Sequence, residues 1–430
     1  MCSVKKWVIA FLVSAMSVLS SCDDSLEGRI GLCDVLVAVE LPEDVSPESV
    51  SDVSIVFHNV SSLADTQFFN NETMRVIPGL YDVTYTATAR LVNGAESELR
   101  AVRTSVVIGG DRTVISMQPF NNIANDDFII AEIFFAGTLQ PSGNQYNGDD
   151  YVKIYNNTDH VLYADGLTFF ESRFLTTEKY DYTPDIMSEA VTVHALYTIP
   201  GSGHEHPVEP GGYILLADTG IDHRVINPNS FDLSHADWEW YDVSTQPNEL
   251  DIDSPSVPNL DKIYCYTKSF FILHNRGFKC YGLARIPVDN DTYLRDYKYT
   301  YQYVIEIPAG TFPMSQSYYK LPNEWIVDAV NCSVAAKYAW NVCAPGLDMG
   351  WTWCGTIDKD MTRYFHSVRR KLLYLREDGT PVFKDTNNST EDFNPHVTPS
   401  EIELQGTAAD ADGKPAGEIT YDGITPIVTK

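Results

Sequence analysis

The residues with the clearest potential for chemistry are two histidines near the middle of the chain. The segment GSGHEHPVEPGG places His204, Glu205 and His206 in a stretch rich in glycine and proline, and two imidazoles two residues apart could chelate a transition metal. The HExxH pattern of zinc hydrolases is absent, and the spacing fixes no third ligand. His223 and His235 could join the pair, but nothing in the sequence requires it. We therefore expect an ordinary loop and no metal.

Two other segments are rich in carboxylates and amides, the groups that bind hard cations. They are DIDSP, residues 251–255, and DTNNSTED, residues 385–392. Neither follows the EF-hand pattern, and Asp and Asn are also the usual residues of turns. Turns are the expected structure and a structural calcium ion is the alternative. No other cofactor is expected.

The cysteines could form disulfides if the chain leaves the cytoplasm. Of the eight, Cys2 and Cys22 belong to the N-terminal anchor region discussed below, which leaves six, an even number. We expect Cys265 to pair with Cys280 across a hairpin, and two of Cys332, Cys343 and Cys354 to pair with each other. Cys33 is expected to stay free. A zinc site is not expected, because no two cysteines have the C-x2-C spacing.

Two segments contain tryptophans two residues apart, DWEWYD (residues 237–242) and GWTWCG (residues 350–355). In an extended strand both rings of a pair face the same side. One interpretation is a buried stripe in the core. The other is an exposed surface for a protein partner, because aromatic residues are enriched at interfaces. The candidate partner-binding residues are Trp238, Trp240, Tyr241, Trp351 and Trp353.

Catalytic patterns are missing from the sequence. It contains no G-x-S-x-G, no P-loop and no Rossmann glycine pattern. Carboxylates are so frequent that no glycosidase pair can be identified. The formal charge of −29 would repel phosphate backbones, which argues against nucleic-acid binding. We expect a non-enzymatic protein, with a hydrolase of surface polymers as a less favoured alternative.

The elements that must position these residues are strands. The chain is 44% hydrophobic and 12% aromatic, which is enough to bury a core, and its 430 residues suggest two or three domains. Helical periodicity is rare, so we predict an all-β protein with helix only in short pieces such as residues 335–340.

Residues 34–118 are predicted to form the first β domain. After a Pro-Gly turn, Tyr81, Val83, Tyr85 and Ala87 alternate with polar residues, as in a half-buried strand. This segment resembles the pG-x-Y-x-V strand of transthyretin-like and Cna-B-like modules, which usually serve as stalks. TSVVIGGDRTVISMQ predicts a closing hairpin over residues 109–111. The polar stretch 119–127 is the expected linker.

Residues 128–395 are predicted to form the second, larger β domain. The segment GDDYVKIYNNTDHVLYADGLTF, together with Ile130, Glu132 and Ile133, resembles a lamin-tail-type immunoglobulin-like sandwich. VEPGGYILLAD and NEWIVDAVN resemble later segments of that module. Because the usual module is much shorter, the resemblance implies insertions, and residues 396–430 are expected to be a tail. The expected insertions are residues 170–198, 219–262 and 281–320.

The N-terminus predicts a membrane anchor. Two lysines precede an apolar segment that is too short to span a bilayer, as in a secretory signal over residues 1–21. The run LSSC resembles the lipobox of bacterial lipoproteins, which implies acylation of Cys22 and a lipidated linker over residues 22–33. Asp23 and Asp24 resemble the signal by which Bacteroidota send lipoproteins to the outer face of the outer membrane. We expect a lipid-anchored protein at the cell surface.

Several ordered segments, including DLSHADWEWYDV, SVRRKLLY and KDTNNSTEDFNP, resemble an uncharacterised family of Bacteroidota lipoproteins. That family has a domain of unknown function and tends to accompany TonB-dependent outer-membrane receptors. The resemblance implies an accessory binding or assembly subunit of such a receptor complex. A free-standing surface binding protein or adhesin is the alternative.

Overall fold

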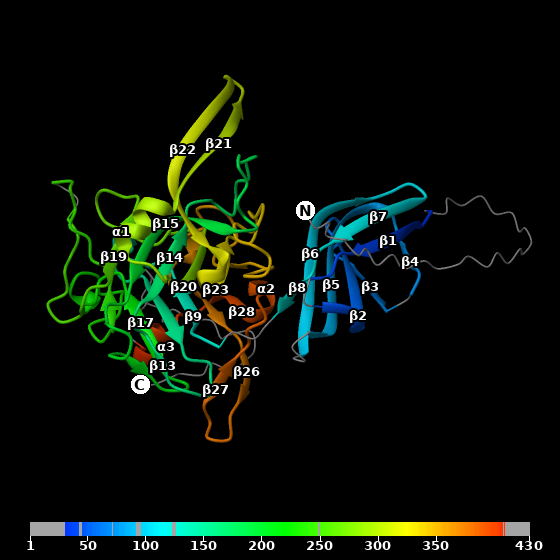
Figure 1. Ribbon diagram of the computed structural model, residues 1–430. Helices are drawn as coiled ribbons and strands as arrows, with labels where there is room; N and C mark the ends of the chain where they lie inside the picture. Colours follow the sequence, from blue (N-terminus) through cyan, green and yellow to red (C-terminus); the bar gives the residue numbers. More distant parts are fainter. Residues whose placement is uncertain are drawn as a thin grey trace, which may run out of the picture. The chain divides into compact units, whose positions relative to one another are not determined.

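The computed structural model describes residues 31–42, 45–70, 72–91, 96–122, 126–247, 250–406 and 408. The leader, the lipidation site Cys22 and the export signal Asp23 and Asp24 lie outside these residues. The chain divides into two compact units, Met1–Ile123 and Ala124–Lys430, and the division falls within the expected linker. Both units consist mainly of strands (Figure 1), so the predicted all-β fold is confirmed.

The first unit contains a five-stranded sheet, β3-β2-β5-β6-β8, and a three-stranded sheet, β4-β1-β7. In β5 the side chains of Tyr81, Val83, Tyr85 and Ala87 are buried as the alternation predicts. The strands are β1 (Cys33–Val39), β2 (Val45–Asn59), β3 (Asp65–Phe69), β4 (Met74–Val76), β5 (Gly79–Leu91), β6 (Glu96–Ile108), β7 (Arg112–Met117) and β8 (Phe120–Asn122).

The hairpin expected over residues 109–111 is wrong. After β6 the chain crosses to the other sheet, where β7 pairs in parallel with β1, from Asp34 opposite Arg112 to Val39 opposite Met117. This pairing places the apolar side chains of both strands in the core of the unit, where a hairpin with β6 would leave that sheet uncompleted. The unit also extends past the expected end at residue 118, because β8 pairs with β6.

The second unit is built on a six-stranded sheet, β18-β17-β12-β9-β25-β28, and an eight-stranded sheet, β21-β22-β15-β14-β20-β23-β24 with β19 beside β15. Two-stranded pieces, β10-β11, β13-β16 and β26-β27, complete it. The strands are β9 (Ile129–Phe134), β10 (Thr138–Leu139), β11 (Gln145–Tyr146), β12 (Tyr151–Tyr155), β13 (Leu162–Tyr163), β14 (Leu167–Ser172), β15 (Ala190–Thr198), β16 (Pro207–Val208), β17 (Tyr213–Ala217), β18 (Trp238–Glu239), β19 (Asp261–Cys265), β20 (Cys280–Arg285), β21 (Lys298–Ile307), β22 (Gly310–Pro322), β23 (Ile326–Ser333), β24 (Thr352–Trp353), β25 (Ser367–Arg370), β26 (Leu372–Leu375), β27 (Pro381–Phe383) and β28 (Phe393–Val397).

The helical pieces of this unit are short. They are α1 (Asn290–Asp296), α2 (Ser389–Asp392), α3 (Ser400–Gln405) and the 3-10 turns η1 (His223–Val225), η2 (Asn323–Trp325) and η3 (Met361–Arg363). None of the described helices is long and apolar enough to cross a membrane. The helix expected over residues 335–340 is wrong: the amides of Ala339 and Trp340, which a helix would bond to the carbonyls of residues 335 and 336, donate to the carbonyl of Thr176.

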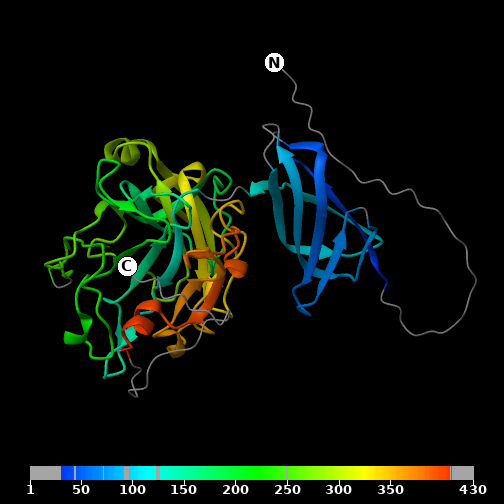
Figure 2. The same cartoon turned by 90° about the horizontal axis from the view of Figure 1, so that it is seen from below.

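Strand β12 shows how the core is arranged. Val152 and Ile154 face the core between the two sheets, while Tyr151 and Tyr155 face a second apolar layer on the outside of the smaller sheet. The strand is therefore buried on both faces. The outer layer includes Ile402 of α3, the red helix of Figures 1 and 2. The tail expected from residue 396 is therefore wrong for its first part, which belongs to the fold.

The expected insertions also need correction. β15, within residues 170–198, is a central strand of the larger sheet, and β20 begins the segment 281–320 inside the same sheet. The rest of that segment contains α1 and the β21–β22 hairpin, which extends away from the body of the unit (Figure 1).

Candidate functional site

The first tryptophan pair belongs to the core. Trp238 is 8% exposed and Trp240 is 0% exposed. The indole of Trp240 stacks on Phe169 with ring centroids 5.8 Å apart, and its Nε1 donates to Asp218 Oδ1 at 2.9 Å. The exposed-platform interpretation is wrong for this pair, because β18 pairs with β17 and turns Trp240 inward. Tyr241 is half-buried.

The second pair lies nearer the surface. Trp351 and Trp353 are half-buried. Trp351 stacks on Tyr338 with centroids 4.6 Å apart, and Trp353 stacks on His396 at 5.7 Å. Since a ring of the chain itself covers one side of each indole, only part of each tryptophan is accessible. These two residues stay candidates for partner binding.

The His204–Glu205–His206 loop is held by a carboxylate that the sequence did not indicate. Asp165 Oδ1 accepts the amides of Gly203 and Glu205 at 3.1 and 2.9 Å, and its Oδ2 accepts the amide of His206 at 2.9 Å. Burial raises the pKa of Asp165, but these hydrogen bonds have the larger combined effect and lower the pKa to about 2. Ligand atoms of Asp165, Glu205 and His206 lie within 4.8 Å of one another. Because the amides already occupy both Asp165 oxygens, the arrangement fits an ordered loop better than a metal centre.

The other two histidines have different partners. His223 Nε2 lies 2.8 Å from the carbonyl of Thr219 and its Nδ1 lies 2.8 Å from the hydroxyl of Tyr146. His235 contacts Glu401, with 3.1 Å between Nε2 and Oε2. Neither contact involves the His204–His206 loop.

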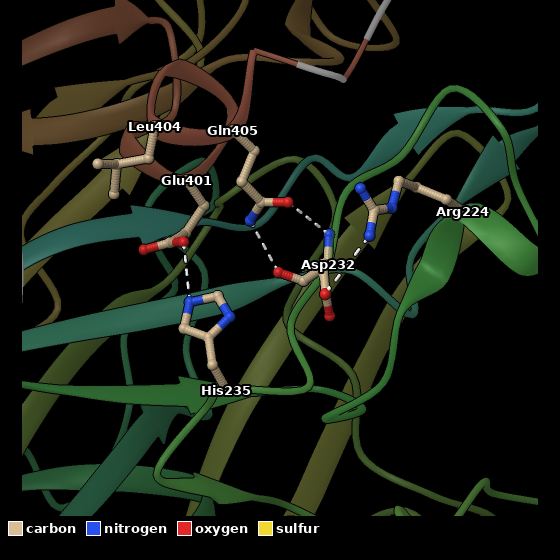
Figure 3. A pocket seen from close by; sticks show the side chains of 6 residues that line it. All are labelled: Arg224, Asp232, His235, Glu401, Leu404 and Gln405. Carbon is tan, nitrogen blue, oxygen red and sulfur yellow. Dashed lines mark hydrogen bonds and ion pairs between the residues drawn. The ribbon is translucent and has the colours of Figure 1, made fainter.

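The pocket in Figure 3 has a volume of about 410 Å³ and lies where α3 meets the segment from η1 to His235. Glu401 pairs with His235 on the rim and with buried Lys153 at 2.9 Å. These two partners lower the pKa of Glu401 to about 2, against the opposing effect of burial. The main chain of Asp232 both donates to and accepts from the Gln405 amide at 2.8 Å. The pocket therefore lies along the contact by which α3 is attached to the six-stranded sheet, and we call this contact the seam. It is lined by Arg224, Asp232, His235, Glu401, Leu404 and Gln405.

The two segments considered for calcium differ in their surroundings. In residues 385–392, Asp385 and Asp392 lie 2.9 and 3.8 Å from the guanidinium of Arg370, and Asp392 also accepts hydrogen bonds from Thr386. That segment is a turn followed by the short helix α2, and Arg370 neutralises its carboxylates. Residues 251–255 place the carboxylate of Asp251 near Asp218. After burial, this carboxylate is the largest cause of the raised pKa of Asp218.

All six described cysteines are free thiols, Cys33 among them. The expected pairing of Cys265 with Cys280 is wrong, because β15 and β14 lie between their strands. Three strand spacings separate them by roughly 14 Å, well beyond the reach of a disulfide. Instead the thiol of Cys343 lies near that of Cys280, and burial together with this neighbour raises the pKa of Cys280 well above its usual value. The expected bridge within Cys332, Cys343 and Cys354 is not formed.

The sequence analysis missed the β21–β22 hairpin, which we call the arm. Its strands pair from Lys298 opposite Tyr319 to Ile307 opposite Gly310. β15 pairs only with residues 319–322 of β22, and Thr183 pairs with Gln302. Beyond these points, within the residues that the structure describes, the arm is a ribbon of two strands with no further strand on either edge.

One face of the arm is mainly apolar, with Gln316 opposite Tyr301 as its polar member. At its base this face is buried, with Tyr301 1% exposed and Tyr318 2% exposed. Beyond the body it continues into solvent, where Ile307 is 51% exposed and Phe312 is 44% exposed. The signal in the sequence was the alternation of KYTYQYVIEI around a Pro-Ala-Gly turn. The part of this face beyond the base, which we call the arm face, comprises the half-buried Tyr303, Ile305 and Met314 and the exposed Ile307 and Phe312.

Comparisons with known proteins agree with this architecture and name no activity. Residues 209–400 match a family described as "Protein of unknown function (DUF4876)". The chain is similar to the crystal structure of a DUF4876 family protein from Bacteroides thetaiotaomicron. The two share 21% sequence identity with a TM-score of 0.53, and the match covers 85% of this chain and 96% of that one. This likeness shows the fold. A search of curated proteins found no match.

Proposed function

We propose that the protein is a lipid-anchored protein of the outer-membrane surface that binds an integral outer-membrane protein through the arm. In this role it is an accessory subunit of a receptor complex of the TonB-dependent type. The single observation that carries the proposal is the exposed arm face on a ribbon that extends beyond the sandwich.

The physical argument begins with the stability of the arm. A ribbon of two strands is marginally stable in water unless its apolar face packs against something. The arm face continues the buried face of Tyr299 and Tyr301 into solvent: Tyr303 still packs against Tyr180 and Tyr182, whereas Ile307 and Phe312 at the tip are exposed core-like side chains. Open strand edges add a second means of attachment, since they can pair with an extended segment of another chain. Both features suit a protein partner.

The opposite face of the arm provides the matched comparison. Gln302, Glu306, Thr311 and Ser315 project from it together with the apolar pair Val304 and Pro313, because all six alternate with the residues of the arm face. The two faces differ most at the tip, where Ile307 and Phe312 lie on one and Glu306 and Thr311 on the other, and this difference defines an orientation for docking. The partner is therefore expected to cover the side that bears Ile307 and Phe312.

The lipid anchor supports an outer-membrane partner. Acylation at Cys22 would keep the chain and its partner in the same membrane, where the high effective concentration strengthens a modest interface. The first unit separates the anchor from the second unit along the chain, a role that fits its stalk-like resemblance. The half-buried pair Trp351 and Trp353 favours the alternative, a free-standing surface binding protein, and the experiment below distinguishes the two.

The test is affinity purification of the full-length protein from outer membranes of the native producer. We expect one integral outer-membrane protein to co-purify with the wild-type chain and with Thr311→Lys, and to be lost with Ile307→Lys. Both variants add one lysine to the arm, on opposite faces, so a difference in recovery reports the face. Thermal denaturation should show equal melting temperatures.

The proposal fails if both variants recover the partner equally, or if no integral outer-membrane protein co-purifies. Loss only with Trp351→Ala would favour the alternative. Anchoring is tested separately: Cys22→Ala should release the protein from the membrane, and full protection from protease on intact cells would reject the surface location.

A further inference from the structure

Two buried carboxylates face each other at the end of β12. Tyr151 pairs with Ala217, so Asp150 and Asp218 are the next residues opposite each other, and the amide of Asp218 donates to the carbonyl of Asp150 at 2.8 Å. Side chains so placed lie on the same side of the sheet with Cβ atoms roughly 5 Å apart. Asp150 is 0% exposed and Asp218 is 6% exposed.

Neither oxygen of Asp150 accepts a hydrogen bond of normal geometry. Burial and the charges of Asp149 and Asp218 raise the pKa of Asp150 well above its usual value, and a contact with the Gly137 amide opposes this only in part. Asp218 accepts hydrogen bonds from Trp240 and Thr219, but its pKa is raised well above the usual value too, by burial and by Asp251.

The structure supplies no basic partner for these groups. None of the four carboxylates Asp149, Asp150, Asp218 and Asp251 forms an ion pair with any Lys, Arg or His that the structure describes. Elsewhere in the unit buried carboxylates do have such partners, as Glu171 has Lys279 and Asp328 has Arg370. Leaving several carboxylates uncompensated in an apolar core is costly.

A third oxygen in the same turn also lacks a partner. Asn147 Oδ1 is buried and accepts no hydrogen bond, and the Asn147 carbonyl accepts the Asp150 amide at 3.2 Å, which closes the turn 147–150. Gly137 allows the neighbouring loop to lie against this turn, because a Cβ there would be 2.0 Å from the Tyr146 carbonyl oxygen. The unpartnered groups here are therefore all oxygens of one turn, Asn147 Oδ1 and both of Asp150, and the carboxylate of Asp218 lies on the strand opposite.

We propose that the turn 147–150 and the end of β17 hold one hard divalent cation of the calcium class, with Asn147, Asp150 and Asp218 as its side-chain ligands. An all-oxygen, anionic donor set selects hard cations and not the softer transition metals. Calcium accepts irregular sites with carboxylate, amide and carbonyl ligands, whereas magnesium keeps several waters and needs near-octahedral geometry. The cation neutralises the cross-strand pair and joins β12 to β17.

A proton shared by the two carboxylates is the competing explanation. It would neutralise one charge, but it would leave Asn147 Oδ1 without a partner. The two explanations differ in whether the wild type responds to calcium, and Asp150→Asn shows whether a response comes from this pair. If a proton neutralises the pair, the variant binds no cation and the wild type binds none either. If a cation does so, only the wild type responds to calcium.

The test uses the purified full-length protein, freed of metal with EDTA. Melting temperature is measured in EDTA, CaCl2 and MgCl2, and Tb³⁺ luminescence is excited through nearby Tyr281 and Trp240. We expect calcium to raise the melting temperature more than magnesium does, and Tb³⁺ to give a signal that calcium displaces. Asp150→Asn should lose both responses, while its melting temperature in EDTA equals or exceeds that of the wild type.

Glu205→Gln is the matched control. It removes a carboxylate from the separate cluster of Asp165, Glu205 and His206, so it should keep both responses. Should Asp150→Asn fail to fold, Asn147→Ala removes a ligand at the half-buried start of the turn and should weaken Tb³⁺ binding. The proposal is overturned if millimolar calcium leaves the melting temperature of the wild type unchanged and Tb³⁺ gives no displaceable signal. It is equally overturned if Asp150→Asn keeps the calcium response.

Discussion

Asp150 and Asp218 form a cross-strand carboxylate pair buried beside Trp240, whose indole N–H donates to Asp218 at 2.9 Å. Like charges opposite each other destabilise a sheet, so this position is occupied at a cost unless a proton or a cation neutralises it. The relationship makes stability dependent on pH in a direction that can be stated.

Stability in EDTA should fall as pH rises above neutrality. Burial raises the pKa of Asp149 to about 7 and that of Asp150 and Asp218 well above the usual range. An acid whose pKa is raised by folding stabilises the fold while it is protonated, and this contribution is lost as pH rises through the folded pKa. Each group that titrates contributes a slope of about 1.4 kcal/mol per pH unit.

Chemical denaturation at about pH 6.5 and about pH 8.5 measures this loss. The interval lies above the range in which His223 and His274 act, because burial lowers their pKa to about 4 and they destabilise the fold as pH falls below their ordinary value of about 6.5. Calcium should reduce the loss, because the cation takes the place of the proton. A free energy of unfolding that increases over this interval in EDTA would contradict the account.

Glu401→Gln should destabilise the protein by about 3–5 kcal/mol, because it leaves the buried ammonium of Lys153 without its carboxylate. His235→Asn is the matched control at the rim of the same seam. The His235 side chain is 44% exposed, so its removal should cost about 1 kcal/mol or less. Urea denaturation of both variants checks the prediction, and equal costs would show that Lys153 does not depend on Glu401.

The two tryptophan pairs should respond differently to truncation. Trp240→Ala removes a fully buried ring from the central core and should cost about 3–5 kcal/mol. Trp351→Ala loses mainly the stacking on Tyr338 and should cost about 1 kcal/mol. Melting temperatures of the two variants, measured in parallel, show whether Trp240→Ala is the more destabilising change. A larger loss for Trp351→Ala would place that residue in the core.

Oxidative refolding should join Cys280 to Cys343 and not to Cys265. The two thiols would lose two protons and two electrons to glutathione disulfide, which leaves as two thiols. Since burial raises the pKa of Cys280 well above its usual value, the reaction needs the unfolded chain. Mass spectrometry of peptides from protein refolded with glutathione disulfide identifies the bridge. A peptide that joins Cys265 to Cys280 would contradict the predicted bridge between Cys280 and Cys343.

The parts of the fold that could be predicted rest on local patterns. The alternation in β5 was readable because that strand buries one set of side chains against a single layer, whereas β12 is buried on both faces. The helix expected over residues 335–340 failed because the amides of Ala339 and Trp340 bond to Thr176, a partner that no local pattern indicates.

The candidate sites depend on contacts between distant segments. Tryptophans two residues apart share a face whether that face is core or surface, and only the pairing of β18 with β17 decides that Trp240 is buried. Asp150 and Asp218 became a pair through the register of β12 and β17. The arm had a readable alternation, but its exposure follows from where β15 stops pairing with β22.

The central claim is that the arm face contacts an outer-membrane protein. The most direct test places a photo-crosslinking amino acid at Ile307 in cells of the native producer, with the same residue at Thr311 as the comparison. We predict that Ile307 crosslinks to one integral outer-membrane protein and that Thr311 does so far less. Equal yields from both positions, or no crosslink to an outer-membrane protein, would contradict the claim.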